Sequence, residues 1–323
     1  MQPPTTTNSL LQETPPDDLP GKALGIIILN LNGVEVTLDC LASLRQSTYR
    51  DFFVILVDNG SSDDSAIRIR AGYPEVDLIE TGENLGFTGG NNIGMQRALD
   101  RGARVLLLLN NDTLAAPDFL GRLMAGLDFD DHLGAVTPKI LFHEPADRIW
   151  SAGGDISLWR GIARHRGLRD SMDDPAYDTP MDVTFVTGCA LCVRADVVRK
   201  IGLLDNDLFI YNEDTDYSLR IAQAGFAMRY IPDAVLWHRE GYDSRRATGQ
   251  KRRMLLCTRN ILRVHRKHRR WYHALTFYPW FTFRWVLLAG LNALRRGDRD
   301  TVAGILAGLA AYRRNETGPA RNG

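Results

Sequence analysis

The chain has 323 residues, of which 44% are hydrophobic and 24% are charged. These values are ordinary for a folded domain with a sizeable core, so they exclude wholesale disorder. The formal net charge is zero, but residues 1–238 carry 20 Lys and Arg against 34 Asp and Glu, whereas residues 239–300 carry 16 against 4. The sequence therefore predicts an acidic body followed by a basic C-terminal region.

Residues 1–21 are rich in Pro, Thr and acidic residues, and we expect them to form a disordered leader. They lack the charged start and apolar centre of a secretory signal, so the four cysteines favour a reducing, cytoplasmic compartment. Cys189 and Cys192 lie in a strand-like run, where residues three apart point to opposite faces. Two buried thiols are therefore favoured over a zinc site.

Apolar runs that begin at residues 23, 52 and 103 alternate with segments of helical periodicity. The third run contains four leucines and stops abruptly at Asn110, and a further helix is expected to begin after Pro117. Strands that alternate with helices indicate an α/β fold with a mostly parallel sheet and helices on both faces. Rossmann-like sheets of this kind bind ligands at the carboxyl ends of their strands.

Polar side chains follow each of these three predicted strands. A single Asp in such a place is often no more than the cap of the next helix. Three independent strand ends at one edge of a sheet instead favour a ligand site. The residues concerned are Asn30 and Asn32 after the first strand, Asp58 after the second, and Asn110, Asn111 and Asp112 after the third.

Residues 83–99 interleave glycines with asparagines ahead of a helical pattern, and they include Asn84, Gly86 and Gly90. Glycines let the backbone approach a ligand closely, and N–H groups ahead of a helix suit an anionic or sugar-bearing ligand. The spacing matches neither a Walker A loop nor the dinucleotide fingerprint. We interpret the segment as a glycine-rich ligand-binding loop.

Five carboxylates lie between residues 205 and 216, and an apolar stretch at 208–211 interrupts them. Such a cluster is usually a solvated face, but the apolar neighbours indicate that part of it runs beside the core. A carboxylate in those surroundings has a raised proton affinity and can act as a base. His238 ends a later strand pattern, where a lone histidine is structural unless nearby carboxylates make it a metal ligand.

Six segments in order resemble one known family. They are "ILNLNG", "VDNGSSD", "ENLGFTGGNNIG", "LLLNNDT", the run from "TGCALC" to "AQAGF", and "LWHREGYDS". From about Leu24 to about His268 the sequence resembles the family 2 glycosyltransferases of the GT-A fold, and within them the bacterial rhamnosyltransferase-like branch. We accordingly expect a catalytic domain over residues 22–244, a helical region over 245–312 and a disordered tail over 313–323.

The resemblance implies transfer of a sugar from a nucleotide-diphosphate donor to an acceptor hydroxyl in one displacement, with inversion at the anomeric carbon. Asp214 matches the second residue of the family's Glu-Asp pair and would be the base, with Glu213 beside it. Asp112 matches the last residue of the family's DxD motif, and with His238 it would hold Mg²⁺ or Mn²⁺. This chain has Asn110 where many relatives have an acid, so the site would depend on these two ligands.

By the same matching, the remaining polar residues would bind the donor. Asp58 would accept hydrogen bonds from the base or ribose, Asn30 and Asn32 would flank the nucleoside, and Asn84, Gly86, Gly90, Asn110 and Asn111 would shape the donor pocket. The donor implied is a dTDP- or UDP-sugar, with rhamnose favoured by the resemblance. The acceptor implied is a saccharide, such as a polyprenyl-linked one, used in cell-surface polysaccharide synthesis.

Two rival functions remain open. A processive polysaccharide synthase shares the fold, but it carries a QxxRW motif, and here Lys267 stands where the Gln should precede Arg270 and Trp271. A non-catalytic sugar-binding homologue would have no use for a base, so the presence of Asp214 argues against it.

The basic region has two interpretations. Residues 245–270 interleave cations with apolar residues, as a basic amphipathic helix does, and residues 271–294 are rich in aromatics but include Pro279 and Arg284. One interpretation is peripheral membrane contact through residues 245–294, on the inner face of the plasma membrane. The other is a helical hairpin packed on the catalytic domain. Nucleic-acid binding is disfavoured, because no recognition motif accompanies the charge.

Overall fold

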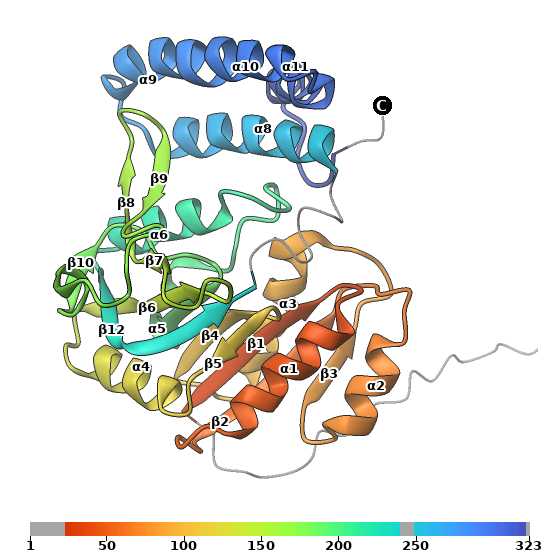
Figure 1. The fold of residues 1–323 in the computed structure, drawn as a ribbon, viewed down its shortest axis with the longest axis vertical. Helices are drawn as coiled ribbons and strands as arrows, with labels where there is room; N and C mark the ends of the chain where they lie inside the picture. Colours follow the sequence, from red (N-terminus) through yellow and green to blue (C-terminus); the bar gives the residue numbers. More distant parts are fainter. Residues whose placement is uncertain (1–22, 240–248, 321–323) are drawn as a thin grey trace, which may run out of the picture.

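The computed structural model describes residues 23–239 and 249–320 (Figure 1). The predicted leader, residues 1–21, lies outside the described residues, as do the first residues of the predicted helical region and the last three of the predicted tail. The first half alternates strands and helices as expected. Its elements are β1 (Leu24–Asn30), α1 (Val34–Arg45), β2 (Phe52–Asp58), α2 (Ser65–Gly72), β3 (Asp77–Glu80), α3 (Gly86–Asp100) and β4 (Val105–Asn110).

The second half extends the same sheet with strands of mixed direction. Strands β3, β2, β1 and β4 are parallel neighbours, and β11 then pairs antiparallel with both β4 and β6. The α/β fold with a parallel core is thus confirmed. The elements are β5 (Thr113–Ala115), α4 (Phe119–Asp128), β6 (Leu133–Phe142), β7 (Ile149–Ala152), β8 (Gly154–Ser157), β9 (Ile162–His165), η1 (Pro175–Tyr177), β10 (Met181–Val183), β11 (Ala190–Arg194), α5 (Ala195–Ile201), α6 (Glu213–Gln223) and β12 (Ala227–His238).

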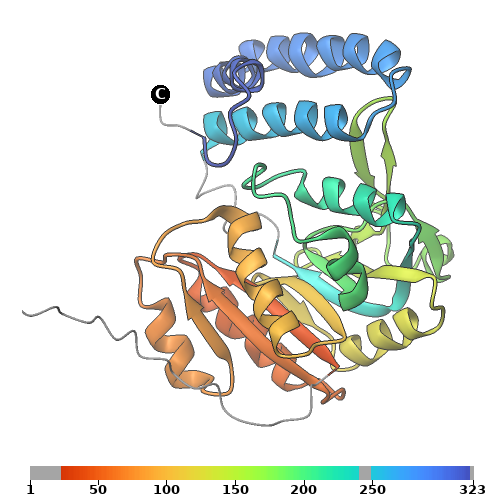
Figure 2. The ribbon, with the colours of Figure 1, turned by 180° about the vertical axis from the view of Figure 1, so that it is seen from behind.

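Side chains of the central strands alternate between two apolar cores, one on each face of the sheet. In β1, Ile26 and Ile28 face the core formed with α1, α2 and α4, whereas Ile27 faces the core formed with α3, α5 and α6. Figures 1 and 2 show these two helical layers on opposite sides of the sheet. Strands buried on both faces are continuous apolar runs, which explains why the pattern was readable in the sequence.

Only residues 83–85 of the glycine-rich segment precede the helix, which therefore includes the glycines that were expected to form a loop. Helix α3 begins at Gly86 and continues through the glycines and asparagines to Asp100. A Cβ at Gly90 would lie 2.3 Å from Leu29 Cδ1, and one at Gly94 would lie 2.4 Å from Ile27 Cγ2. These two glycines therefore let the helix pack closely on β1, a role that a glycine-rich pattern does not distinguish from ligand binding.

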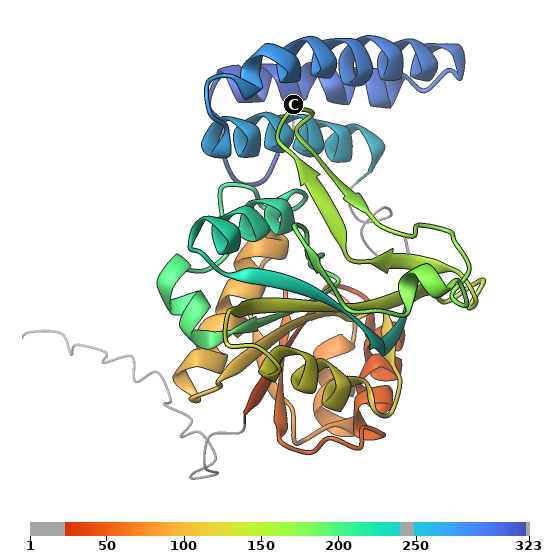
Figure 3. The same cartoon turned by 90° about the vertical axis from the view of Figure 1, so that its left-hand side faces the viewer.

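The C-terminal helices form a second body above the carboxyl edge of the sheet (Figure 3). They are α8 (Gln250–His268), α9 (His273–Phe281), the π-helical turn η2 (Thr282–Leu288), α10 (Ala289–Arg295) and α11 (Arg299–Arg313). The β8–β9 hairpin reaches up to them, and Thr276 Oγ1 donates a hydrogen bond to Trp159 O at 3.0 Å. Within the described residues, no helix has both the length and the apolar character needed to cross a bilayer.

Helix α8 is held between the body that contains the sheet and α11. Gly304 and Gly308 of α11 sit against the α8 backbone, where a Cβ would lie 2.4 Å from Lys251 O and 2.6 Å from Leu255 O. Residues 314–320, which fall in the predicted tail, run back across the same helix, and Gly318 N donates to Asp207 O at 2.9 Å. Of the two interpretations of the basic region, α8 follows the packed one.

Candidate active site

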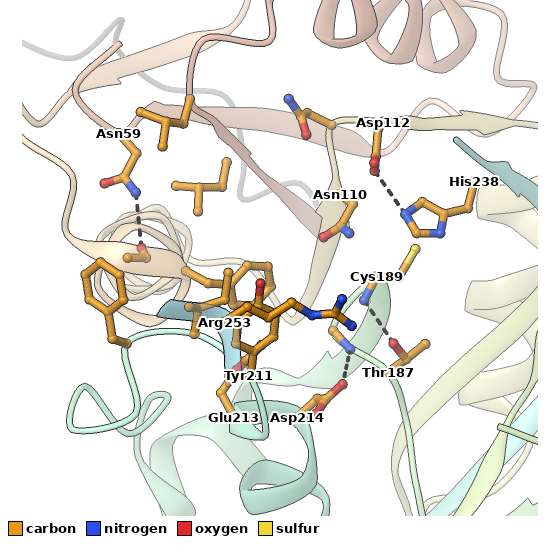
Figure 4. Close-up of a pocket in the computed structure, with 18 of the residues that line it drawn as sticks. Asn59, Asn110, Asp112, Thr187, Cys189, Tyr211, Glu213, Asp214, His238 and Arg253 are labelled. Carbon is orange, nitrogen blue, oxygen red and sulfur yellow. Dashed lines mark hydrogen bonds and ion pairs between the residues drawn. The ribbon is translucent and has the colours of Figure 1, made fainter. Parts of the chain in front are cut away.

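A cavity of about 480 Å³ opens between the carboxyl edge of the sheet and the helices α6 and α8 (Figure 4). Two of its walls carry carboxylates that are far apart in the sequence. Asp112 and His238 lie on the sheet side, whereas Glu213 and Asp214 lie at the start of α6. Its polar lining consists of Asn59, Asn84, Asn110, Asn111, Asp112, His165, Thr187, Cys189, Tyr211, Glu213, Asp214, His238, Arg252 and Arg253.

Asp112 and His238 meet because two strand ends pair. The short strand β5 runs antiparallel to the end of β12, with Thr113 opposite His238, and Arg239 N donates to Asp112 O at 2.9 Å. This pairing sets His238 Nε2 3.2 Å from Asp112 Oδ1, with both side chains at most 10% exposed. The His238 ring is in turn held edge-on against Trp150, at 4.7 Å between ring centroids.

The pair has buried atoms that could bind a cation. His238 Nδ1 makes no hydrogen bond, and the polar contact of Asp112 Oδ1 is the one with His238 Nε2. A carboxylate and an imidazole suit Mn²⁺, and two protein ligands plus substrate phosphate are a common set for such a metal. The described residues hold no group of three or more His, Cys, Asp or Glu side chains placed to bind a metal, so the two residues fit a cation only together with ligands from a bound substrate.

Asp214 and Glu213 occupy the first turn of α6, and removal from water is the largest influence on the pKa of both side chains. Burial raises the pKa of Asp214 above its ordinary value, although Gly188 N, at 3.3 Å, and Thr215 N, at 2.7 Å, donate to its carboxylate. Burial, together with the charge of Asp214, raises the pKa of Glu213 to about 8. Near neutral pH, Glu213 is therefore mostly protonated, and the raised pKa of Asp214 means that its carboxylate has an increased proton affinity.

Asn30 and Asp58 lie behind the cavity wall, and neither lines it. Asn30 Nδ2 donates to Asp58 Oδ1 at 2.7 Å, and both residues are less than 5% exposed. Asn111, which does line the cavity, donates to Thr37 Oγ1 at 2.9 Å, and Thr37 donates to Asn30 Oδ1 at 2.9 Å. The strand-end residues of β1, β2 and β4 are thus brought together in one buried network, as the shared edge predicted.

Some of the other predicted donor-binding residues line the cavity and others do not. Asn84, Gly86 and Asn110 line the cavity, whereas Asn32 and Gly90 do not. Asn32 is exposed at the rim, where its Oδ1 accepts from Ser62 N at 2.7 Å. Gly90 lies beneath Leu29, as described above.

The loop before α6 adopts a backbone that the sequence did not reveal. Phe209, Tyr211 and Asn212 all have positive φ, at 65°, 73° and 67°, which is unfavourable for residues other than glycine. Gly86 makes room for this loop, because a Cβ there would lie 2.4 Å from the Phe209 ring. A loop in this conformation persists only where its surroundings hold it in place.

Helix α8 stabilises this loop through the side chain of Asn260, which is completely buried. Its amide nitrogen Nδ2 lies 2.9 Å from Leu208 O, 2.9 Å from Ile210 O and 2.8 Å from Tyr211 O. The C-terminal end of α8 also anchors α6, because His268 Nε2 lies 2.7 Å from Oδ1 of the fully buried Asp216. Helix α8 lies beyond the predicted catalytic domain in the sequence, yet it positions the wall that carries Asp214.

We expect the variant Asn260→Ala to remain folded, with a lower free energy of unfolding, but to lose most of its activity. Loss of the amide leaves buried carbonyl groups unpaired, which costs about 2 kcal/mol of the free energy of unfolding. Relaxation of the loop then displaces Asp214 and reduces kcat by about 100-fold, with a smaller effect on donor binding. Sugar-transfer kinetics and chemical denaturation measure the two effects. Asn292→Ala, at an exposed position of α10, is the matched control, and an unchanged kcat in Asn260→Ala would mean that the amide stabilises the fold without positioning Asp214.

Known proteins resemble this chain in sequence and in fold. The family described as glycosyltransferase like family 2 matches residues 20–272. The chain is 27% identical over 224 residues to an N-acetylglucosaminyl-diphospho-decaprenol L-rhamnosyltransferase of Mycobacterium tuberculosis, covering 64% of this chain and 72% of that protein. It is 26% identical over 210 residues to the dTDP-rhamnosyl transferase RfbF of Shigella flexneri, covering 64% and 67%.

Solved structures of low sequence identity share the fold. The mannosyltransferase PcManGT of Pyrobaculum calidifontis, in complex with GDP-Man and Mn²⁺, superimposes with a TM-score of 0.57 at 16% identity, over 94% of this chain and 91% of that one. TarS of S. aureus gives a TM-score of 0.53 at 13% identity, over 91% and 92%. The resemblance inferred from the six sequence segments is confirmed, and the chain belongs to the family 2 glycosyltransferases of the GT-A fold.

Proposed function

We propose that the protein is an inverting glycosyltransferase that moves a sugar from a nucleotide-diphosphate donor to an acceptor hydroxyl, with Asp214 as the base. The observation that carries this proposal is that the partly buried Asp214 carboxylate and the Asp112–His238 pair line the same cavity. A pure binding site has no need of a partly buried carboxylate with a raised pKa, whereas single displacement requires a proton acceptor.

In the proposed reaction, Asp214 takes the proton of the acceptor hydroxyl as that oxygen forms a bond to the anomeric carbon. The bond from this carbon to the donor phosphate breaks at the same time, and the nucleoside diphosphate leaves with the electron pair. Position in the first turn of α6 favours the ionised form of Asp214, because the N-terminal end of a helix stabilises negative charge. Glu213, protonated beside it, limits the negative charge that the acceptor must approach.

The donor would lie along the opposite wall of the cavity. Asp112 and His238 would hold Mg²⁺ or Mn²⁺, which when bound supplies positive charge to the diphosphate leaving group. Asn84, Gly86, Asn110 and Asn111 would contact the donor directly. Asn30 and Asp58 would act through Asn111 and the buried network behind it, and Asn32 would contact the nucleoside only from the rim.

Two relatives suggest which sugar and which acceptor the chain uses. RfbF is named as a dTDP-rhamnosyl transferase, and the mycobacterial relative is named for a diphospho-decaprenol-linked acceptor and for rhamnose. We therefore propose rhamnose as the sugar, dTDP or UDP as the nucleotide, and a polyprenyl-diphosphate-linked saccharide as the acceptor. The pathway would be the synthesis of a cell-surface polysaccharide.

The acceptor proposed here would be embedded in a membrane, and the C-terminal helices present a surface that fits one. Large apolar side chains are exposed along α9, η2 and α10 at successive intervals of eight, four, four and three residues. Each interval is close to a whole number of helical turns, so these side chains form one stripe. The stripe consists of Leu275, Phe283, Leu287, Leu291 and Leu294, which are 51–67% exposed. Its surroundings are cationic, since five arginines and a single carboxylate, Asp298, lie in the sequence from Arg270 to Arg299.

This charge distinguishes an anionic bilayer from a second copy of the chain. Each arginine near an anionic membrane surface contributes about 1 kcal/mol of attraction, whereas two copies of the stripe would bring like charges together. An apolar stripe flanked by arginines is also the pattern of helices that lie in the membrane interface. We propose that α9, η2 and α10, rather than the buried α8, contact the membrane.

The variant Asp214→Asn tests the base. It keeps the shape of the side chain but removes the proton acceptor, so kcat should fall by about 100-fold to 10,000-fold. Donor affinity, measured by calorimetry with the nucleotide diphosphate, should remain close to that of the unchanged protein. A parallel loss of donor binding would show that Asp214 holds the donor or the fold, and the assignment of Asp214 as base would then be wrong.

A panel of dTDP-, UDP- and GDP-sugars, each with and without Mn²⁺, tests the donor and the cation. A ligand at 100 times its dissociation constant stabilises the native state by about 2.7 kcal/mol, which a thermal-unfolding assay detects as a raised Tm. We expect the matching donor to raise the Tm further when Mn²⁺ is present, and we expect Asp112→Asn to remove that additional rise. If the rise persists in Asp112→Asn, the cation is not held by this residue.

Vesicle binding tests the apolar stripe. The protein should sediment with vesicles of phosphatidylglycerol and phosphatidylcholine, less so with phosphatidylcholine alone, and binding should weaken as salt is added. The double variant Leu287→Glu/Leu291→Glu should lose this binding, whereas Ile67→Glu, at an exposed site on α2, should not. If the double variant binds vesicles normally and instead converts a dimer to a monomer, the stripe is an interface between two copies.

A further inference from the structure

Two arginines at the start of α8, Arg252 and Arg253, differ from the cations farther along the same helix. Arg263 Nη2 lies 2.8 Å from Asp207 Oδ2, and Lys267 Nζ lies 2.8 Å from Asp216 Oδ1. In the part of the chain that the structure describes, neither Arg252 nor Arg253 makes an ion pair or a side-chain hydrogen bond. Their charges are therefore not neutralised by neighbouring carboxylates.

Both arginines line the active-site cavity. The Arg252 guanidinium lies 5.7 Å from the centre of the Phe209 ring, and its Nε is buried without a hydrogen-bond partner. The Arg253 side chain extends into the middle of the cavity, above the wall that carries Glu213 and Asp214 (Figure 4). A buried N–H group without a partner is costly, so an arrangement of this kind is expected where a ligand supplies the acceptor.

The chemistry of the two side chains limits what that ligand can be. Guanidinium groups form paired hydrogen bonds with carboxylates and phosphates, and two adjacent arginines match a ligand with more than one negative charge. Neither Glu213 nor Asp214 approaches them within ion-pair distance, so the arginines remain available to a ligand. Neutral sugar hydroxyls would leave both positive charges uncompensated.

We propose that Arg252 and Arg253 form a diphosphate-binding site on α8, facing the wall that carries Asp112 and His238. This proposal rests on the proposed function, in which the donor and the acceptor each carry a diphosphate. If the ligand is the donor, the arginines neutralise the leaving group. If it is the acceptor, they hold its diphosphate so that the sugar hydroxyl reaches Asp214. The chemistry recognised is the same in both cases.

The test compares Arg252→Gln, Arg253→Gln and their double variant with Arg266→Gln, in which an exposed arginine of the same helix is changed. Calorimetry with inorganic pyrophosphate, with dTDP and with UDP should show affinity reduced by about tenfold or more for each cavity arginine removed, and unchanged for Arg266→Gln. Arg253→Lys, which keeps the charge but loses the paired geometry, should fall between. Circular dichroism and Tm measurements establish that each variant is folded.

The binding data also separate the two sources of the diphosphate. Weakened dTDP or UDP binding assigns the site to the donor. Unchanged nucleotide binding, together with weakened pyrophosphate binding and a raised KM for a diphosphate-linked acceptor, assigns it to the acceptor. If the folded double variant binds pyrophosphate, dTDP and UDP as the unchanged protein does, and its acceptor KM is also unchanged, the arginine site is wrong. The proposed function fails by different results: no sugar transfer by the unchanged protein with any donor of the panel would rule out the activity, and full transfer activity in Asp214→Asn would rule out the base.

Discussion

The hydrogen bonds from the Asn260 amide to the loop before α6 are the interaction on which the rest of the site depends. Three non-glycine residues of that loop have left-handed backbone conformations, and such conformations are unfavourable without support. The support comes from a helix that follows the catalytic sheet in the sequence. The wall that carries Glu213 and Asp214 is thus built jointly by α6 and α8, and neither helix alone would define the cavity.

Three carboxyl groups in and around this cavity differ in proton affinity because their surroundings differ. Burial without a cation raises the pKa of Glu213 to about 8 and keeps it protonated. Burial would also raise the pKa of Asp216, but His268, Lys267 and Arg220 surround that carboxylate and hold its pKa at about 2, so it stays ionised as an anchor. Burial raises the pKa of Asp214 as well, and two backbone N–H groups that donate to its carboxylate oppose that shift in part. A raised proton affinity suits the role of base proposed for this residue.

Much of the fold could be predicted from the sequence, because strands buried on both faces are readable as apolar runs and their polar ends mark one edge. The residues matched to the family motifs were also brought to this edge, although Asn30, Asn32, Asp58 and Gly90 do not line the cavity. The packing role of Gly90 could not be foreseen, since a glycine required by a close helix–strand contact looks the same in a sequence as one required by a ligand.

The contribution of α8 was hidden for another physical reason. In sequence, Asn260 is one polar residue in a basic helix, and Arg252 and Arg253 are two cations among many. Whether a given cation pairs with a carboxylate depends on contacts between residues about 50 positions apart, such as Arg263 with Asp207. Periodicity along the helix contains no information about those contacts, so the helix was assigned by its composition to a membrane-facing or merely supporting region.

The close contact between α11 and α8 has a consequence for how this enzyme can vary. Gly304 and Gly308 allow the two backbones to touch, and α8 in turn fixes both the loop at Asn260 and the arginines in the cavity. A single methyl group added at either glycine would clash with the α8 backbone, so that α11 would have to move away or α8 would have to move towards the cavity. Substitutions in α11 therefore act on the position of α8. They can alter turnover while every residue that touches the sugar stays the same.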